Sequence, residues 1–270
     1  MSAISSEPLD LDRIRRALPD RRVEYFARTG STNDEARRLA LEGAPDGTAV
    51  LADEQSAGRG RRGARWVSPP ARNLIVSVLR RPGAALPPER WARLTLAAAL
   101  AGCDALDSTP GLSARAEVKW PNDLYLSGKK VAGILVESVM DGGGAGHVII
   151  GTGLNLNLQP ADFPGELRGA ATSVWMENGG LAADRSAFAV LYLQALERRC
   201  RQVTEDFPAM PREAWERSWL AGKTIRLQSA GQELEGLAAG LGPEGELLLR
   251  LEDGKVRSIT SADLVRVAEG

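Results

Sequence analysis

Arginine and glycine are concentrated in one segment of the sequence, Gly58-Arg59-Gly60-Arg61-Arg62-Gly63. The segment matches the GxGxxG pattern of a dinucleotide-binding turn, but that turn must open a helix, and Pro69-Pro70 forbids one here. Guanidinium groups bind carboxylate and phosphate bidentately, and glycine lets backbone amides approach an anion. Because no acidic residue occurs from Gln55 to Arg72, we expect a flexible loop that folds over an anionic ligand. An RNA contact and a solvated loop are the alternatives.

Lysine is scarce in this chain, and a second segment contains most of it. There are five lysines against 29 arginines, and three of the five lie within residues 119–130. The segment Lys119-Trp120-Pro121-Asn122-Asp123 precedes Gly128-Lys129-Lys130, and an apolar strand containing Gly133 follows. Lys130 at this strand end could offset negative charge on a phosphoryl group, and Gly133 leaves room for a ligand beside the backbone. The alternative is an exposed hairpin lysine.

A third polar segment, Gly151-Thr152-Gly153-Leu154-Asn155, ends another apolar strand. Its glycines and asparagine would let a nucleotide approach the backbone and bond to an amide, although a simple turn has the same composition. The chain has one histidine and two widely separated cysteines, and it has no GxSxG or HExxH motif. We therefore expect a reaction that needs neither a histidine base nor a protein nucleophile.

The elements that must position these segments follow from the hydrophobic patterning. Thr32 and Glu35 have the spacing of a capping box, which predicts that a helix begins there. We expect strands at Val23–Ala27, Thr48–Asp53, Asn73–Arg80, Glu117–Trp120, Leu124–Leu126, Lys130–Val139 and Gly146–Leu158. We expect helices at Thr32–Leu41, Glu89–Asp107, Arg185–Thr204 and Arg212–Leu220.

After Gly222 the pattern changes to short strands separated by turns. We expect strands at Thr224–Leu227, Gln232–Leu241, Glu246–Leu251, Lys255–Thr260 and Leu264–Val267. Five strands within so short a stretch predict a small β-barrel with its own core. We therefore divide the chain into two domains, residues 1–222 and 223–270.

Composition limits the class of protein. The 270 residues carry a net charge of −1, and 43% of them are hydrophobic, which is typical of a soluble globular chain rather than a nucleic-acid coat. The N-terminus has no apolar segment like that of a signal peptide, and the longest apolar run, Leu94–Ala101, is too short to cross a bilayer. We therefore expect a cytoplasmic protein with reduced cysteines.

Five segments, taken together and in order, resemble the biotin protein ligases, the biotin–[acetyl-CoA-carboxylase] ligase family. They are Ser31-Thr32-Asn33, Gln55–Gly63, Lys119–Asp123, Lys130–Leu135 and Gly151–Asn155. The resemblance implies an α+β fold, with a mixed-sheet catalytic domain of the biotin/lipoate ligase type and a small C-terminal SH3-like β-barrel. The short segment before residue 25 resembles the monofunctional members, which lack a DNA-binding repressor domain.

The resemblance implies a two-step reaction. The carboxylate of biotin attacks the α-phosphate of MgATP, giving biotinyl-5′-AMP and pyrophosphate. A lysine of the biotin carboxyl carrier protein of acetyl-CoA carboxylase then takes the biotinyl group and releases AMP. Because both first reactants are anions, such a site needs arginine, lysine and Mg²⁺. We expect no metal ligand from the protein, no nucleic-acid or membrane partner, and a monomer or homodimer.

The resemblance also implies residue roles. The catalytic residues would be Lys130, Arg61 and Asp123, with Asp123 receiving the incoming lysine. Biotin would be bound by Ser31, Thr32, Asn33, Gln55, Gly58, Arg59, Arg61, Lys130 and Gly133. ATP and the adenylate would be bound by Arg59, Arg62, Trp66, Lys130 and Asn155. Ala64 stands where the family often has arginine, so Arg65 or Arg62 would have to supply that phosphate contact.

Two other functions compete with this one. A lipoate-type ligase would share the fold, but an apolar dithiolane does not need as many polar partners as Ser31-Thr32-Asn33 and Gln55 offer. An RNA-binding module could use the arginine loop and the barrel. The balanced charge and the 5% aromatic content disfavour this module, because single-stranded RNA is bound on stacking platforms.

Overall fold

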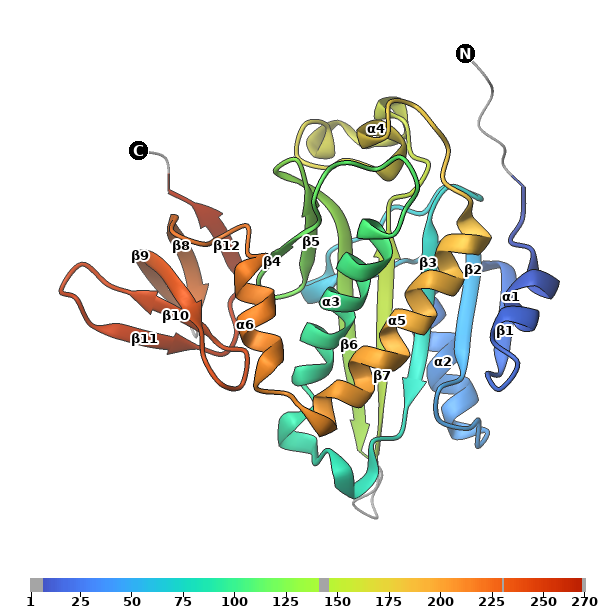
Figure 1. Cartoon of the computed structure of the whole chain (residues 1–270), viewed down its shortest axis with the longest axis horizontal. Coiled ribbons are helices and arrows are strands. Elements are labelled where there is room, and N and C mark those ends of the chain that lie inside the picture. The colour runs from blue at the N-terminus through green and yellow to red at the C-terminus, as the bar shows by residue number, and fades with distance from the viewer. Residues whose placement is uncertain (1–6, 141–145, 230, 269–270) are drawn as a thin grey trace.

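A seven-stranded mixed sheet forms the centre of the computed structural model, which describes residues 7–140, 146–229 and 231–268 (Figure 1). The strand order is β1-β2-β3-β7-β6-β5-β4, with β1 parallel to β2 and the other neighbours antiparallel. The strands are β1 Val23–Thr29, β2 Ala49–Gln55, β3 Leu74–Arg80, β4 Glu117–Lys119, β5 Asp123–Leu126, β6 Lys129–Met140 and β7 Gly146–Leu154.

Helices cover both faces of this sheet, so its central strands are apolar on both sides. Leu51 and Ile150 belong to the main core, which α3 and α5 complete, whereas the adjacent Val50 and Ile149 pack with α2 on the opposite face. Figure 1 shows α3 and α5 side by side in front of the strands. The helices are α1 Leu11–Ala17, α2 Thr32–Leu41, α3 Arg93–Asp107, α4 Val174–Glu177, α5 Arg185–Glu205 and α6 Ala209–Glu216.

The expected helix at 32–41 is present, but the capping box that predicted it is not formed. Ser31 is the N-cap residue, and its side chain makes no capping bond. The backbone N–H of Thr32 donates instead to Oε1 of Gln55 at 2.8 Å, from the end of β2. Glu35 accepts a bond from the Thr29 hydroxyl. A tertiary contact therefore replaces the local one and fixes Gln55 beside the start of α2.

Other predicted helices and strands are present, but their first or last residues differ from the predicted ones. The β5–β6 hairpin turns at Ser127 and Gly128, both of which have the positive φ that a two-residue hairpin turn requires. The helix expected from Glu89 begins at Arg93, because a separate 3-10 turn at Pro88–Arg90 precedes it. Strand β7 ends at Leu154 rather than Leu158. This end of β7 lies beside Gly133 of β6, where the site forms.

The C-terminal residues form a second, five-stranded antiparallel sheet of order β11-β10-β9-β8-β12. Its core contains Ile225, Leu227 and Leu247, and Trp120 of the first domain packs into it. The Trp120 indole N–H also donates to Gly245 O. The small domain is therefore anchored beside the 119–123 segment. Its strands are β8 Thr224–Ser229, β9 Gln232–Leu241, β10 Leu247–Arg250, β11 Val256–Ile259 and β12 Leu264–Val267.

Cys103 and Cys200 are free and buried in α3 and α5. Burial raises the pKa of the Cys103 thiol to about 12 and that of Cys200 to about 11. Within the described ranges, no helix combines the length and the apolar character that crossing a bilayer requires.

Candidate active site

A cavity of about 600 Å³ opens where the arginine loop, the sheet and the C-terminal domain meet. It is the place to which most of the residues predicted for the site converge. Those in its lining are Ser31, Thr32, Asn33, Gln55, Arg59, Arg61, Arg62, Trp66, Asp123, Lys130 and Gly133. Gly58 and Asn155 are the two predicted site residues outside that lining.

The arginine loop folds back on itself in a narrow hairpin. Trp66 N donates to Gly58 O at 2.9 Å, and Gly60 N donates to Ala64 O at 2.6 Å. A Cβ on Gly58 would lie 2.7 Å from the Trp66 carbonyl oxygen, so this position must be glycine. Gly58 thus shapes the base of the loop rather than the cavity wall.

Trp66 covers the cavity floor. Its indole lies against two glycines of adjacent strands, Gly133 of β6 and Gly153 of β7, which are paired in the sheet. A Cβ on Gly153 would come within 2.3 Å of the ring, and one on Gly133 would come within 3.2 Å. The indole nitrogen is buried and has no hydrogen-bond partner among the described residues. The glycines therefore provide a slot for a flat group, and Trp66 fills it here.

Lys130 extends its amine over this floor. The backbone of Lys130 is held on both sides, with its N–H donating to Ala170 O and its carbonyl accepting from Thr172 N. The Nζ lies 2.7 Å from Oδ1 of Asp123 and 5.9 Å from the centre of the Trp66 ring. The amine therefore points into the cavity.

The other predicted catalytic cation is Arg61. Its guanidinium donates to Oδ1 of Asn122 at 3.2 Å and to Ala262 O at 3.4 Å, and in the described part of the chain it forms no ion pair. Burial, followed by the charge of Arg62, lowers its pKa from the ordinary value, and Asp123 opposes this shift. Arg61 is therefore a partly buried cation whose charge an arriving anion would compensate.

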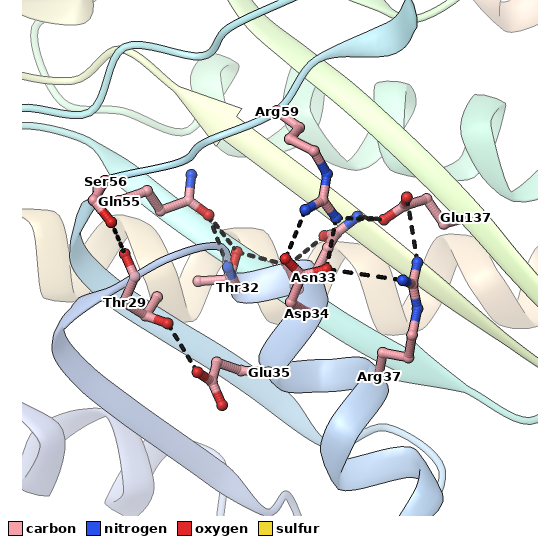
Figure 2. A network of polar contacts seen from close by, with 11 residues as sticks. Thr29, Thr32, Asn33, Asp34, Glu35, Arg37, Gln55, Ser56, Arg59 and Glu137 are labelled. Atoms are coloured by element: carbon pink, nitrogen blue, oxygen red, sulfur yellow. Dashed lines mark hydrogen bonds and ion pairs between the residues drawn. The ribbon is translucent and has the colours of Figure 1, made fainter. Parts of the chain in front are cut away.

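Two other loop arginines, Arg59 and Arg62, have acidic partners. Arg62 pairs with Asp263 of the C-terminal domain. Arg59 forms a two-pronged pair with Asp34, at 2.6 and 2.7 Å, as Figure 2 shows. The bond to Arg59 lowers the pKa of the Asp34 carboxyl. Both arginines are predicted to bind the ligands, and in this structure their guanidinium groups bind protein carboxylates.

The cavity lining also includes a polar wall formed by Ser31, Thr32, Asn33 and Gln55. Gln55 Oε1 accepts from the Thr32 hydroxyl at 3.1 Å, and Ser77 Oγ lies 2.7 Å from Thr32 Oγ1 and 2.6 Å from Asn33 Oδ1. Asn33 Nδ2 donates to Glu137 at 2.7 Å. Ser31, Thr32, Asn33 and Ser77 are buried. Such a fixed set of donors and acceptors suits a ligand with a polar ring rather than an apolar one.

Asn155 lies outside the cavity lining. It is buried, and its side-chain amide donates to Thr172 O at 3.0 Å, next to the segment that holds the Lys130 backbone. Its direct contact with ATP stays a prediction. Thr172 links Asn155 to Lys130, because its carbonyl accepts from the Asn155 amide and its N–H donates to Lys130 O.

Several residues at the site were not assigned from the sequence, namely Lys119, Ala262 and Asp263 in the cavity lining and Ser77, which contacts the lining residues Thr32 and Asn33. Ser77 could have been noticed as the polar residue inside the apolar strand 73–80, and Lys119 lies in a segment already singled out. Lys119 donates to the Tyr125 hydroxyl at 2.9 Å, and burial lowers its pKa. Asp263 and Ala262 come from the other domain, and local patterning in the sequence gave no signal for them.

The chain resembles proteins of known activity over nearly its whole length. Residues 25–155 match the Biotin/lipoate A/B protein ligase family, and residues 221–266 match the Biotin protein ligase C terminal domain. A biotin–[acetyl-CoA-carboxylase] ligase of Paracoccus denitrificans is 40% identical over 233 residues, covering 85% of this chain and 95% of that protein. The bifunctional ligase/repressor BirA of Bacillus subtilis is 37% identical over 242 residues, 89% of this chain and 72% of its own length.

A solved structure agrees with this assignment. The biotin protein ligase from Aquifex aeolicus in complex with biotin and ATP superposes with a TM-score of 0.79 at 27% identity, covering 92% of this chain and 99% of that one. The fold and the cavity define an enzyme of the biotin/lipoate ligase class. More narrowly, the chain belongs to the biotin protein ligase family. The family resemblance and the fold expected from the sequence are thereby confirmed.

Proposed function

We propose that this chain is an ATP-dependent ligase that activates biotin as biotinyl-5′-AMP and transfers it to a lysine of the biotin carboxyl carrier protein of acetyl-CoA carboxylase. One observation carries the proposal within the family. Lys130 and Arg61 line one cavity together with the polar side chains of Ser31, Thr32 and Gln55.

In the first step, the chain's task is to bring two anions together. The polar wall binds the ureido ring of biotin, which directs the carboxylate toward Lys130 and Arg61. The Lys130 amine bridges this carboxylate and the α-phosphate, and it stabilises the charge that grows on the phosphoryl oxygens. Arg61, without an acidic partner in the described chain, compensates the remaining negative charge. The nucleophile is the biotin carboxylate itself, and pyrophosphate leaves.

In the second step, Asp123 orients the amine of the acceptor lysine. Its carboxylate already binds one ammonium group, that of Lys130, and it is only partly exposed. A second amine arriving there would be held by a hydrogen bond and could transfer its proton to the carboxylate as the acyl–nitrogen bond forms and AMP leaves. Asp123 would thus act first as the partner of Lys130 and then as the acceptor of a proton.

Mg²⁺ enters this proposal as part of the substrate MgATP. No group of three or more His, Cys, Asp or Glu side chains in the described ranges is arranged to hold a metal ion. The cationic lining suits a nucleotide that carries its own Mg²⁺, which would neutralise the β- and γ-phosphates. The cytoplasmic location, the monomer or homodimer, and the lack of nucleic-acid and membrane partners remain predictions from the sequence.

Intact-mass measurement tests the proposal. The chain is incubated with biotin, MgATP and an isolated biotin carboxyl carrier domain, and the carrier is weighed. We expect the carrier to gain one biotinyl group, and a carrier whose acceptor lysine is replaced by arginine to gain nothing. A parallel reaction with lipoate and a lipoyl carrier domain tests the competing ligase activity. Modification in the lipoate reaction alone would overturn the proposal.

A further inference from the structure

The arginine loop has few bonds of its own that would keep it closed. Beyond the hairpin bonds inside it, the chain just before the loop is held by Ala57 N donating to Gly30 O and Ser56 N donating to Thr29 O. The tip at Arg62 and Gly63 has left-handed backbone and no apolar anchor. Side-chain contacts must therefore decide how long the loop stays over the cavity.

Arg59 makes the most complete of these contacts. Its guanidinium leaves the loop toward α2, where both terminal nitrogens bind the two oxygens of Asp34, and one of them also lies 3.5 Å from Oε2 of Glu137 on β6 (Figure 2). A bidentate arginine–carboxylate pair fixes direction as well as distance. One loop side chain is thus bound to a helix and to a strand of the catalytic domain.

The two acids are themselves held in place. Glu137 Oε2 accepts from Asn33 Nδ2, and its Oε1 lies 3.4 Å from Arg37. Asn33 belongs to the polar wall, so the same network joins the loop to the wall that faces the ligand. Figure 2 shows Arg37 and Arg59 on either side of the carboxylates. Arg59 therefore binds where two oriented carboxylates converge.

The Arg59–Asp34 pair can hold the loop closed and can also break, because it is partly exposed. The side chains of Arg59 and Asp34 are 36% and 49% exposed, so water and salt screen their attraction. A ligase loop must open for substrates to enter and for the carrier to reach the adenylate. A half-exposed bidentate pair meets both requirements, whereas a buried pair would hold the loop permanently.

We propose that Asp34 is a positioning residue for the ligase reaction, holding Arg59 so that loop 58–66 stays closed while the adenylate forms and waits for its acceptor. Asp34 touches neither ligand, and it acts through Arg59. The role in the reaction rests on the function proposed above, whereas the closing contact itself does not.

Limited trypsin digestion tests the closing contact without any substrate. The loop contains four cleavage sites, Arg59, Arg61, Arg62 and Arg65, none of which Asp34→Asn removes. We expect Asp34→Asn to speed cleavage in the loop about three- to tenfold, the size of a screened bidentate pair. Asp34→Glu should restore most of the protection. Glu35→Gln is the matched control, because it removes a charge from the same helical turn but contacts Thr29 and Arg38.

Two further measurements distinguish loss of the Arg59–Asp34 pair from a general loosening of α2. High salt should narrow the difference between the cleavage rates of the wild type and Asp34→Asn, because it screens the Arg59–Asp34 pair that only the wild type has. Arg59→Gln should raise loop cleavage by a similar factor, scored at the three remaining arginines, and the double variant should add nothing further. Additive effects, or an equal effect of Glu35→Gln, would overturn the assignment.

Retention of the adenylate tests the role in the reaction. We expect Asp34→Asn to release biotinyl-5′-AMP about three- to tenfold faster and to raise the KM for biotin, with a smaller change in kcat. A lowered kcat with unchanged release and KM would overturn the positioning role. If the wild-type chain forms no adenylate while the trypsin result holds, the proposed function fails and the closing contact remains.

Discussion

The amine of Lys130 lies 2.7 Å from the carboxylate of Asp123, which lies opposite Gly133 on the neighbouring strand. The pair faces the cavity, and its two side chains are 34% and 20% exposed. One charged pair thus brings together the cation that the first step needs and the carboxylate that the second step needs. Replacing either partner should separate the two steps.

Asp123→Asn should affect transfer more than adenylation. The neutral amide cannot take a proton from the acceptor lysine, so transfer to the carrier should slow by about 10²-fold or more. Formation of biotinyl-5′-AMP should fall much less, because Lys130 keeps its charge. Single-turnover assays that begin from preformed adenylate isolate the transfer step. Equal losses in both steps would contradict the assigned role.

Gly153→Ala should impair biotin binding through Trp66. A methyl group there would lie 2.3 Å from the indole, so the ring must leave its slot between the strands. Overpacking of this kind costs about 1–3 kcal/mol, which predicts a KM for biotin raised about five- to a hundredfold. Gly165→Ala is the control, because nothing lies within 4 Å of its added Cβ. An unchanged KM in Gly153→Ala would show that Trp66 does not form the floor in solution.

A buried ion pair outside the site should contribute more to the free energy of unfolding than an exposed pair does. Arg185 and Asp53 are paired at 2.6 Å with side chains only 5% and 8% exposed, and the Tyr25 hydroxyl donates to the same carboxylate. Arg185→Met would leave that carboxylate buried without its cation, at a cost of about 3–5 kcal/mol in the free energy of unfolding. Arg13→Met breaks an exposed pair with Asp184 and should cost less than about 1 kcal/mol. Urea unfolding measures both, and similar values would contradict the prediction.

Alkaline pH should destabilise the fold through its tyrosines. Burial raises the pKa of Tyr25 and of Tyr125 to about 12, and it raises that of Tyr192 as well. In the unfolded chain these tyrosines ionise at their ordinary pKa of 10.0, so the folded state holds more protons between pH 10 and 12. Their contribution to the free energy of unfolding is therefore fully present below pH 10 and is lost as the pH rises from 10 to 12. Ultraviolet titration should show no phenolate near pH 10 in the folded protein. Phenolate formation there without unfolding would contradict the assignment.

Local sequence signals predicted much of this fold and the centre of the site. Lys130 and Gly133 follow a recognisable hairpin turn, and the hydrophobic patterning that predicted a strand at Lys130–Val139 placed it within one residue of β6 at each end. Contacts between distant segments could not be predicted in this way. Gln55, rather than Glu35, accepts the hydrogen bond from Thr32 N at the start of α2, and Arg59 pairs with Asp34 of that helix. Both contacts join segments that are distant in the sequence. Likewise, the bond that Asn155 donates to Thr172 O gave no local signal in the sequence.

Pyrophosphate exchange into ATP tests the central claim, that the cation at position 130 lets biotin attack the α-phosphate. The exchange should depend on biotin in the wild-type chain, and Lys130→Ala should slow it by about 10²-fold or more. Lys129→Ala removes the neighbouring lysine, which lies outside the cavity lining, and should leave the rate unchanged. Exchange that proceeds without biotin, or that Lys130→Ala leaves intact, would contradict the account.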